Sequence, residues 1–377
     1  MDQGQQSQVD EMRGVVIAHQ PATTRVFIGS PSIVILPDGT YVVSHDFFGP
    51  GSSAWVQGVT RLYRSVDRGA TWRLVAEITG AFWSSLFLHR DALYLMGPDR
   101  HFGAVLIRRS TDGGHSWTRP TNQDDGLLLK GEYHGAPVPV IVHNGRIWRA
   151  METAHGPVRE WGKRLGAMMM SAPEDADLLA AESWVCSPPR YYDPTYLQGH
   201  FNGWLEGNAV VAPDGGIRNI LRVDDKHTLE EKVAVVSVSA DGRSTFFDPM
   251  QDFIPFPGGS KKFTIRYDPL SQCYWVLSNH IPDTLMESYR GQNPSLIRNT
   301  LTLAWAPDLR NWEVSHTILH HPEASRYGFQ YADWQFDGDD IVLVCRTAHY
   351  DDTGGAVRSH DTNYLTFHRI RQFRKLG

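Results

Sequence analysis

The sequence is poor in the features that mark several large classes of protein. Its 377 residues include only three cysteines, Cys186, Cys273 and Cys345, which lie far apart and form no metal-ligand spacing. Cys273 and Cys345 sit within apolar runs, so we expect buried free thiols. No apolar stretch is long enough to cross a membrane, and the polar start MDQGQQSQVDEM lacks the hydrophobic region of a signal peptide.

An excess of basic residues is also absent. The chain has 36 Lys and Arg against 42 Asp and Glu, a formal net charge of -6 and a pI near 6.3. This balance argues against nucleic acid or an anionic membrane as a partner. The sequence leaves two localisations open: a periplasmic or secreted protein whose signal peptide is missing from this chain, or a cytoplasmic protein.

The chain does contain a repeated turn segment. The stretches LYRSVDRGATWRLV (62–75) and LIRRSTDGGHSWTRP (106–120) both read Ser-x-Asp-x-Gly-x-Ser/Thr-Trp after a short strand, which is the Asp-box pattern. We expect the Asp side chain to accept backbone hydrogen bonds, the Gly to adopt a left-handed conformation and the Trp to pack under the hairpin. Looser copies occupy 167–184, 235–249 and 302–314.

A second kind of hairpin precedes each of these outer ones. It consists of two β-branched runs joined by a turn of Gly, Asp, Asn or Pro, and it recurs about every 50 residues, a period typical of propeller blades. The copies are 33–46, 85–97, 137–153, 208–223, 263–280 and 332–349. The sequence therefore predicts an all-β fold, a single β-propeller of six four-stranded antiparallel blades over residues 13–377, after a disordered segment 1–12.

Two features of this architecture stay open at the level of sequence. The last strand, within 363–373, needs a partner, which either 14–20 or 24–28 can supply to close the ring. A seventh blade within 187–204 or 281–300 is the alternative to six.

The two hairpin turns of a blade lie on one face of the disk, so the strand ends around the axis meet on the opposite face. Aligning the inner hairpins on their turns places Asp46, Glu152, Arg222, Arg346 and Asn279 in one register position. Polar or aromatic residues at the same end add further candidates for binding a substrate: Trp83, His134, Glu206, Asn208, Lys261, Lys262, His280, Gln330, Tyr331, Asp333 and His349. Charges at strand ends are costly unless they are paired or meet a polar ligand.

Each of these residues also has a purely structural interpretation. The charged ring can be a salt-bridge network, His280 and His349 can cap strands, and Lys261 with Lys262 can be a solvated pair. His45 favours a functional interpretation, because a neighbouring carboxylate can tune its pKa for proton transfer near neutrality.

The Asp-box hairpins and the first blade resemble the sialidase superfamily over residues 25–377. Sialidases carry an Arg in a Phe/Tyr-Arg-Ile-Pro motif on the first strand, whereas the matching stretch here, 27–31, has Gly29 at that place. The stretches 29–52 and 328–373 are more similar to propeller enzymes that release L-rhamnose α-1,4-linked to D-glucuronic acid in arabinogalactan and gum arabic. That resemblance implies an active enzyme centred on one histidine, which in this chain is His45.

The resulting hypothesis is removal of rhamnose by β-elimination, with His45 as acid and base and with Arg222 and Arg346 neutralising the uronate carboxylate. The alternatives are retaining hydrolysis of the same bond, an exo-sialidase, and a non-catalytic glycan-binding propeller. We expect a monomer with a glycan substrate and no required cofactor, and a structural calcium ion in the central tunnel is a further hypothesis.

Overall fold

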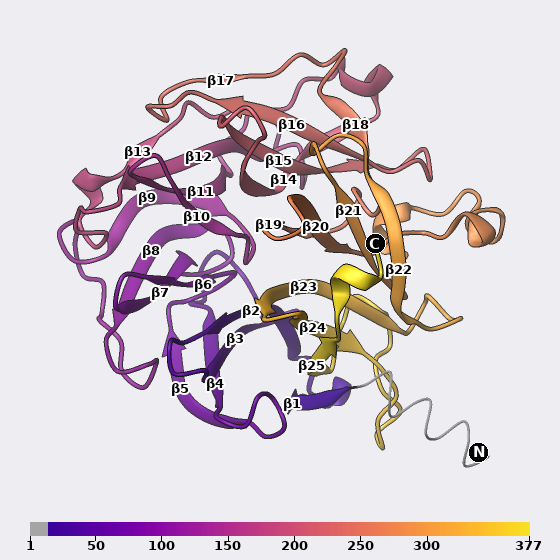
Figure 1. Cartoon of the computed structure of the whole chain (residues 1–377), viewed down its shortest axis with the longest axis horizontal. Coiled ribbons are helices and arrows are strands. Elements are labelled where there is room, and N and C mark those ends of the chain that lie inside the picture. The colour runs from indigo at the N-terminus through magenta and orange to yellow at the C-terminus, as the bar shows by residue number, and fades with distance from the viewer. Residues whose placement is uncertain (1–13) are drawn as a thin grey trace.

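Antiparallel strands follow one another around a central axis in the computed structural model, which describes residues 14–377 (Figure 1). The predicted disordered segment 1–12 lies outside the described residues. Three of the five sheets have four strands each. The first contains β2 (Phe27–Ile35), β3 (Tyr41–Phe48), β4 (Val59–Ser65) and β5 (Arg73–Thr79). Another contains β19 (Thr264–Asp268), β20 (Cys273–Ser278), β21 (Thr300–Ala306) and β22 (Glu313–His320).

The remaining four-stranded sheet closes the ring. It contains β23 (Gly328–Asp337), β24 (Asp340–Ala348), β25 (Tyr364–Ile370) and the N-terminal β1 (Val15–His19). Because β1 pairs antiparallel with β25, the first of the two predicted closures is correct. A 3.0 Å contact between His19 Nε2 and Asp351 Oδ2, and stacking of His19 on Tyr364, fasten this outer strand.

The other two sheets are larger. One contains β14 (Phe201–Val211), β15 (Ile217–Asp225), β16 (Lys232–Val238), β17 (Thr245–Phe246) and β18 (Phe253–Pro255). The other contains β6 (Ser85–His89), β7 (Ala92–Pro98), β8 (Gly103–Ser110), β9 (Leu127–His134), β10 (Val140–His143), β11 (Arg146–Thr153), β12 (Gly166–Pro173) and β13 (Val185–Cys186). Strand β9 joins its two halves, because it pairs with both β8 and β11.

The predicted inner hairpins are all present as antiparallel pairs, namely β2–β3, β6–β7, β10–β11, β14–β15, β19–β20 and β23–β24. The prediction of six separate four-stranded blades is nevertheless wrong, because hydrogen bonding through β9 merges two of them and leaves five sheets. The segments proposed for a seventh blade form no hairpin. They contain the 3-10 turns η3 (Tyr196–Gly199), η4 (Asp283–Leu285), η5 (Glu287–Tyr289) and η6 (Pro294–Leu296).

The repeated turn segments make the local contacts that their sequence predicts. Asp67 accepts hydrogen bonds from the backbone N and the hydroxyl of Thr71, and Trp72 Nε1 donates to the Gly69 carbonyl at 3.1 Å. The second segment repeats this pattern, since Trp117 Nε1 donates to Gly114 at 3.0 Å. These bonds fix the turns between β4 and β5 and after β8.

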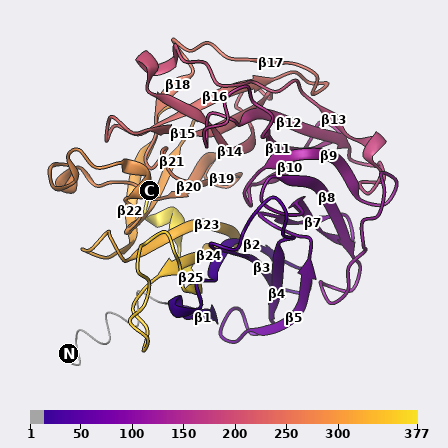
Figure 2. The ribbon, with the colours of Figure 1, turned by 180° about the vertical axis from the view of Figure 1, so that it is seen from behind.

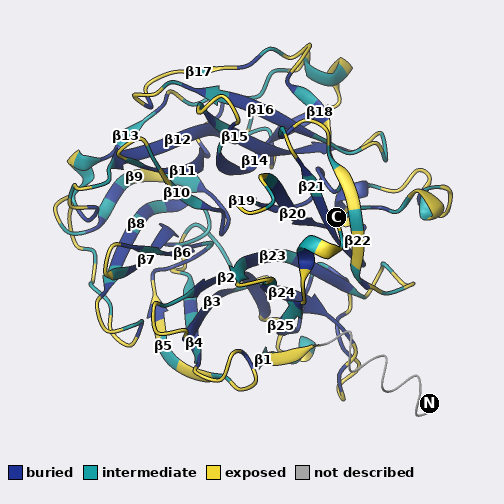
Figure 3. Ribbon diagram, viewed as in Figure 1, coloured by how far each residue is buried: buried dark blue, intermediate teal, exposed yellow. Residues whose placement is uncertain are grey.

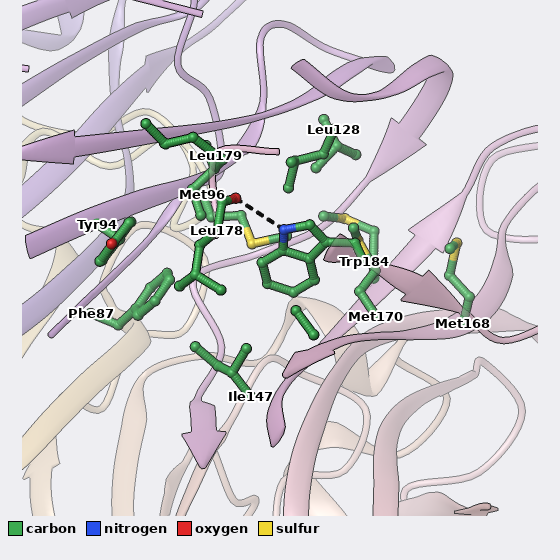
Figure 4. Packing of buried hydrophobic residues seen from close by; sticks show 14 residues of the cluster. Phe87, Tyr94, Met96, Leu128, Ile147, Met168, Met170, Leu178, Leu179 and Trp184 are labelled. Carbon is green, nitrogen blue, oxygen red and sulfur yellow. Dashed lines mark hydrogen bonds between the residues drawn. The ribbon is translucent and has the colours of Figure 1, made fainter. Parts of the chain in front are cut away.

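Buried side chains fill the spaces between neighbouring sheets, and exposed residues lie on the outer strands and loops (Figure 3). In the largest cluster the indole of Trp184 packs against methionine and leucine side chains and donates a 3.0 Å hydrogen bond to the Leu178 carbonyl (Figure 4). Cys345 is buried, whereas Cys186 and Cys273 are only half-buried, and all three thiols are free. No helix in residues 14–377 is long and apolar enough to cross a membrane.

Candidate active site

The inner strands are distorted at the end where the site was expected. Register shifts interrupt β2 between Ile28 and Pro31, β14 between Leu205 and Asn208, and β23 between Gln330 and Asp333. Such bulges change the direction in which the neighbouring side chains point. Trp83, just before β6, and Glu206 and Tyr331, within β14 and β23, have left-handed φ angles of 47°, 53° and 56°. Non-glycine residues held in this region cost about 1–3 kcal/mol each and gather at functional sites.

Glu206 connects two of these strained strands. Its Oε1 accepts a 2.6 Å hydrogen bond from the Tyr331 hydroxyl, and its Oε2 accepts a 3.0 Å bond from Arg222 Nη1. Burial is the largest single influence on Glu206 and opposes its ionisation, but the Arg222 charge and the other favourable contacts of the site, including the hydrogen bonds from Tyr331 and Arg222, together hold the pKa of Glu206 below its usual range. Burial, together with the Glu206 charge, raises the pKa of Tyr331, so the phenol remains the proton donor of the pair.

Two further guanidinium groups lie against the Tyr331 ring. The Cζ atom of Arg346 is 4.1 Å from the ring centroid, and that of Arg298 is 5.8 Å away. Arg298 donates to Gln330 Oε1 at 2.7 Å and to the Ser295 carbonyl, whereas Arg346 reaches Gln330 only at 3.4 Å. Burial lowers the pKa of Arg298 to about 10 and also lowers that of Arg346.

Arg298 and Arg346 have no carboxylate within 4.0 Å among the residues the structure describes, although both are at least 95% buried. The nearest negative charges, Glu206 and Asp46, act on them only at longer range. Buried cations without a carboxylate in direct contact are expensive, so a site that keeps two of them is prepared for an anionic ligand. A planar guanidinium pair matches a carboxylate in particular.

Further contacts join predicted residues of β3, β9 and β11 and of the segment before β6. The Trp83 backbone N donates to Asp46 Oδ2 at 3.4 Å, and the Trp83 ring lies 4.6 Å from His134. His134 Nδ1 is 3.1 Å from Glu152 Oε2, and the other Glu152 oxygen accepts from the backbone N of Gly207, which follows Glu206. Burial raises the pKa of Asp46 to about 6, and its Oδ1 has no hydrogen-bond partner in residues 14–377.

These contacts link side chains of neighbouring inner strands around the axis, and we call the group the axial ring. It consists of the eight predicted residues Asp46, Trp83, His134, Glu152, Glu206, Arg222, Tyr331 and Arg346, together with Arg298. The sequence assigned eight of these nine residues to the site, and the structure brings all eight together. Their individual roles stay predictions.

Other candidates hold sheets together instead of lining the ring. Asn208 accepts from the backbone of β19 at 2.9 Å, and Asn279 donates to carbonyls at the starts of β21 and β23, both at 2.8 Å. Lys262 Nζ donates to a β23 carbonyl at 2.8 Å, and Lys261 is paired with the buried Glu231. Burial lowers the pKa of Lys262 to about 8.

His280 and His349 also lie apart from the axial ring. His280 Nδ1 is 3.9 Å from Glu231 Oε2 and lines a separate cavity at the edge of β16. His349 is buried with its ring 5.1 Å from that of Tyr327. Asp333, a further candidate, accepts from the Ser32 hydroxyl at 2.8 Å, and both residues line a cavity away from the axial ring.

The predicted mechanism has His45 acting beside Arg222 and Arg346, but within the described residues His45 contacts neither arginine. Its ring is fully buried, stacks on Tyr63 with centroids 5.8 Å apart and meets Phe47 edge-on at 4.9 Å. Nδ1 lies 2.9 Å from the Asp46 carbonyl oxygen, and burial lowers the pKa of His45 to about 4. Successive residues of a strand face opposite sides, so it is the Asp46 side chain, and not that of His45, that joins the ring.

Sequence reasoning missed Arg298 and two residues of the loop before β25. His360 Nδ1 lies 2.9 Å from Asp361 Oδ1, and the His360 ring is 5.2 Å from that of Phe48, over which Arg346 also lies. Arg298 precedes β21 in a segment without a strand pattern, so no alignment of hairpins points to it. The Ser-His-Asp tripeptide at 359–361, which repeats the one at 44–46, is the only sequence signal for the second pair.

Comparisons with known proteins show the fold. No protein-family description matches the chain, and no curated protein matches it either. Among solved structures, an α-L-arabinanase from Penicillium chrysogenum with bound arabinobiose is 13% identical, covers 96% of this chain and 98% of its own, and has a TM-score of 0.57.

Two further structures extend this likeness. A Hadza microbial sialidase is 12% identical with a TM-score of 0.63, covering 96% of this chain and 69% of its own. An α-L-arabinofuranosidase from Fusarium graminearum, in complex with an iminosugar inhibitor, is 10% identical with a TM-score of 0.57, covering 97% and 100%. The chain therefore has the propeller architecture found in sialidases and in arabinan-cleaving enzymes.

Proposed function

We propose that this protein is a carbohydrate-active enzyme that cleaves a glycosidic linkage at a carboxylate-bearing sugar. The observation that carries the proposal is the pair of buried guanidinium groups, Arg298 and Arg346, without a carboxylate partner in the described chain. The acid group of a sugar would supply the missing charge. Structural likeness to a sialidase, an α-L-arabinanase and an α-L-arabinofuranosidase supports a glycan as the substrate.

The reacting groups would lie next to the bound carboxylate. Tyr331 and Glu206 share a 2.6 Å hydrogen bond beside Arg346, so a proton can pass between them without a change in position. Asp46, whose pKa burial raises to about 6, would act as the acid that protonates a departing oxygen. The two carboxylates thus take different roles, because the pKa of Glu206 lies below and that of Asp46 above the usual range.

The finer proposal is release of L-rhamnose from α-1,4-linked D-glucuronic acid by β-elimination. A base removes the proton at uronate C5, a C4–C5 double bond forms, the C4–O bond breaks, and the departing oxygen receives a proton. Arginines on the carboxylate stabilise the negative charge that develops during proton removal. Glu206, acting directly or through Tyr331, is the base that the contacts favour over His45.

The second candidate is retaining hydrolysis of an acidic glycoside, and the Tyr331–Glu206 hydrogen bond favours it specifically. Glu206 would accept the phenol proton as the Tyr331 oxygen attacks the anomeric carbon, the glycosidic C–O bond breaks, and Asp46 protonates the departing oxygen. Water would then attack the same carbon and give a proton to Asp46, while the Tyr331 oxygen leaves and recovers its proton from Glu206. Tyrosine nucleophiles are known in glycosidases that act on an acidic sugar. Arg346 lies over Phe48 of β3, beside the strand whose Gly29 replaces the sialidase arginine, and so brings a cation to that side of the site.

Digestion of a rhamnosyl-glucuronate disaccharide with the ultraviolet absorbance recorded separates these routes. Elimination yields rhamnose and a 4,5-unsaturated uronate that absorbs in the near ultraviolet, whereas hydrolysis yields rhamnose and saturated glucuronate. Release of sialic acid from a chromogenic sialoside would instead identify an exo-sialidase. If none of these substrates, nor gum arabic, gives a product, the proposal of an enzyme is wrong and a glycan-binding propeller remains.

A further inference from the structure

A cavity of about 400 Å³ adjoins the axial ring on the side of the loop between β3 and β4. We call it the loop cavity. This loop, drawn in indigo, lies near the centre of the face seen in Figure 2. Its volume falls in the range of small-ligand sites, and its lining includes Phe47, Phe48, Val56, Gln57, Phe82 and His101.

The loop cavity shares its walls with the axial ring. Phe48 has Arg346 at 4.9 Å from its ring centroid, so one surface of this side chain faces the cavity and another faces a ring cation. On the other side, the rings of Phe82 and His101 lie 4.3 Å and 5.1 Å from that of Trp83. The loop cavity and the axial ring therefore lie on either side of the same aromatic side chains, one side chain apart.

The lining of the loop cavity differs in charge from the axial ring. Its lining includes two arginines. Arg61 is neutralised, because Nε lies 2.7 Å from Glu77 Oε2, whereas Arg25 forms no ion pair within the described residues. Aromatic faces, glycines and serines make up most of the remaining wall. Such a surface offers stacking faces for the apolar side of a sugar ring and donors for its hydroxyls.

An exposed tryptophan belongs to the loop that lines the cavity. Trp55 precedes Val56 of the cavity wall, and the two neighbours are 88% and 56% exposed. The loop holds this position because Gly58 N donates to the Asp99 carbonyl at 2.9 Å and Gln57 forms a bridge with Arg100. The loop thus presents two adjacent apolar side chains to solvent, and contiguous exposed apolar surface is characteristic of a binding site.

We infer that the loop cavity is a binding subsite for an uncharged sugar adjoining the acidic sugar at the axial ring, with Trp55 as its stacking platform. This inference rests on the proposed function for the assignment of the acidic sugar. The inference adds that the enzyme binds at least one further sugar residue of the glycan chain, so that longer substrates bind better than a disaccharide.

The test compares substrate lengths in the wild type, Trp55→Ala and Val66→Ala. Val66 is a matched control, because it is an 80% exposed apolar residue of the same sheet in the turn after β4. The readout is the ratio of kcat/KM for a rhamnosyl-glucuronyl-galactose trisaccharide to that for the disaccharide. Loss of one aromatic stacking contact should lower this ratio about tenfold in Trp55→Ala and leave it unchanged in Val66→Ala. Equal ratios in all three proteins would overturn the inference.

A binding measurement separates failure of this inference from failure of the proposed function. Saturation-transfer NMR with galactobiose needs no turnover. If the wild type cleaves neither substrate, the proposed function fails, and the loop cavity is then judged by binding alone. Transfer in the wild type and Val66→Ala but not in Trp55→Ala supports the subsite. Equal transfer in all three, or none in the wild type, contradicts it.

Discussion

Replacing Arg346 by methionine should separate stability from function. Arg346 is 96% buried, has no carboxylate partner in the described chain, and makes a single long hydrogen bond of 3.4 Å to Gln330. Its guanidinium lies over Phe48 and Tyr331, against which a methionine side chain can also pack. The substitution thus removes a buried charge while it keeps most of the volume.

The two expected effects have opposite signs. Replacing buried charges by apolar groups of similar size is often neutral or stabilising by about 1–4 kcal/mol, so the free energy of unfolding should stay level or rise. Each charge-assisted hydrogen bond to a substrate carboxylate contributes about 1.5–3 kcal/mol. Loss of two such bonds should lower kcat/KM by a factor of about 10² to 10⁴.

Urea unfolding followed by tryptophan fluorescence gives the first quantity, and rhamnose release from the disaccharide gives the second. Arg369→Met is the matched control, because Arg369 Nη1 lies 2.6 Å from Asp337 and 3.0 Å from Asp340, remote from the ring. It should lose about 2 kcal/mol of stability and no activity. An Arg346→Met protein that is strongly destabilised yet fully active would refute the reasoning.

Three other outcomes are expected. Asp46 must be protonated to act as an acid and its pKa is about 6, so kcat/KM should fall as the pH rises through 6. The Asp46→Asn variant should lose most of the activity, and its pH profile should lack this fall. Tyr331→Phe should lower kcat by at least about 10³ without unfolding the protein, as checked by circular dichroism, because the phenol oxygen is lost but the ring still packs on Arg346. His45 has a folded-state pKa of about 4, below the usual 6.5, so between these pH values the unfolded state binds more protons than the folded state. The free energy of unfolding should therefore fall by about 3 kcal/mol as the pH drops from 6.5 to 4. Denaturation curves should show a weaker pH dependence of this free energy in His45→Phe.

The sequence predicted the strand pairs because they depend on local chemistry. In the turn between β10 and β11, Asn144 and Gly145 both adopt left-handed φ angles, which is what an Asn-Gly hairpin requires. The Asp-turn-Trp segments likewise fold through contacts within five residues. Pairing through β9 was not predictable in this way, since it depends on where a strand without a hairpin partner comes to lie.

The site was predictable only as a set of strand ends. Alignment of the hairpins collected Asp46, Arg222 and Arg346, and the strand starts added Glu206 and Tyr331, but neither could show which faces these residues take, because bulges change the alternation within the strands. His45 was chosen from its Ser-His-Asp motif and from a resemblance, and Arg298 lies in a segment without a strand pattern. Contacts between sheets join residues far apart in the chain and leave no local pattern in the sequence. Glu206 and Tyr331, for example, are separated by 125 positions.

The central claim is that the enzyme recognises its substrate by a sugar carboxylate held at Arg298 and Arg346. The most direct measurement compares rhamnose release from a rhamnosyl-glucuronate disaccharide and from its carboxyl-reduced counterpart, rhamnosyl-glucose, at equal concentration. The account predicts turnover of the uronate and a loss in kcat/KM of at least about 10² for the reduced sugar. Equal rates on both sugars would contradict it.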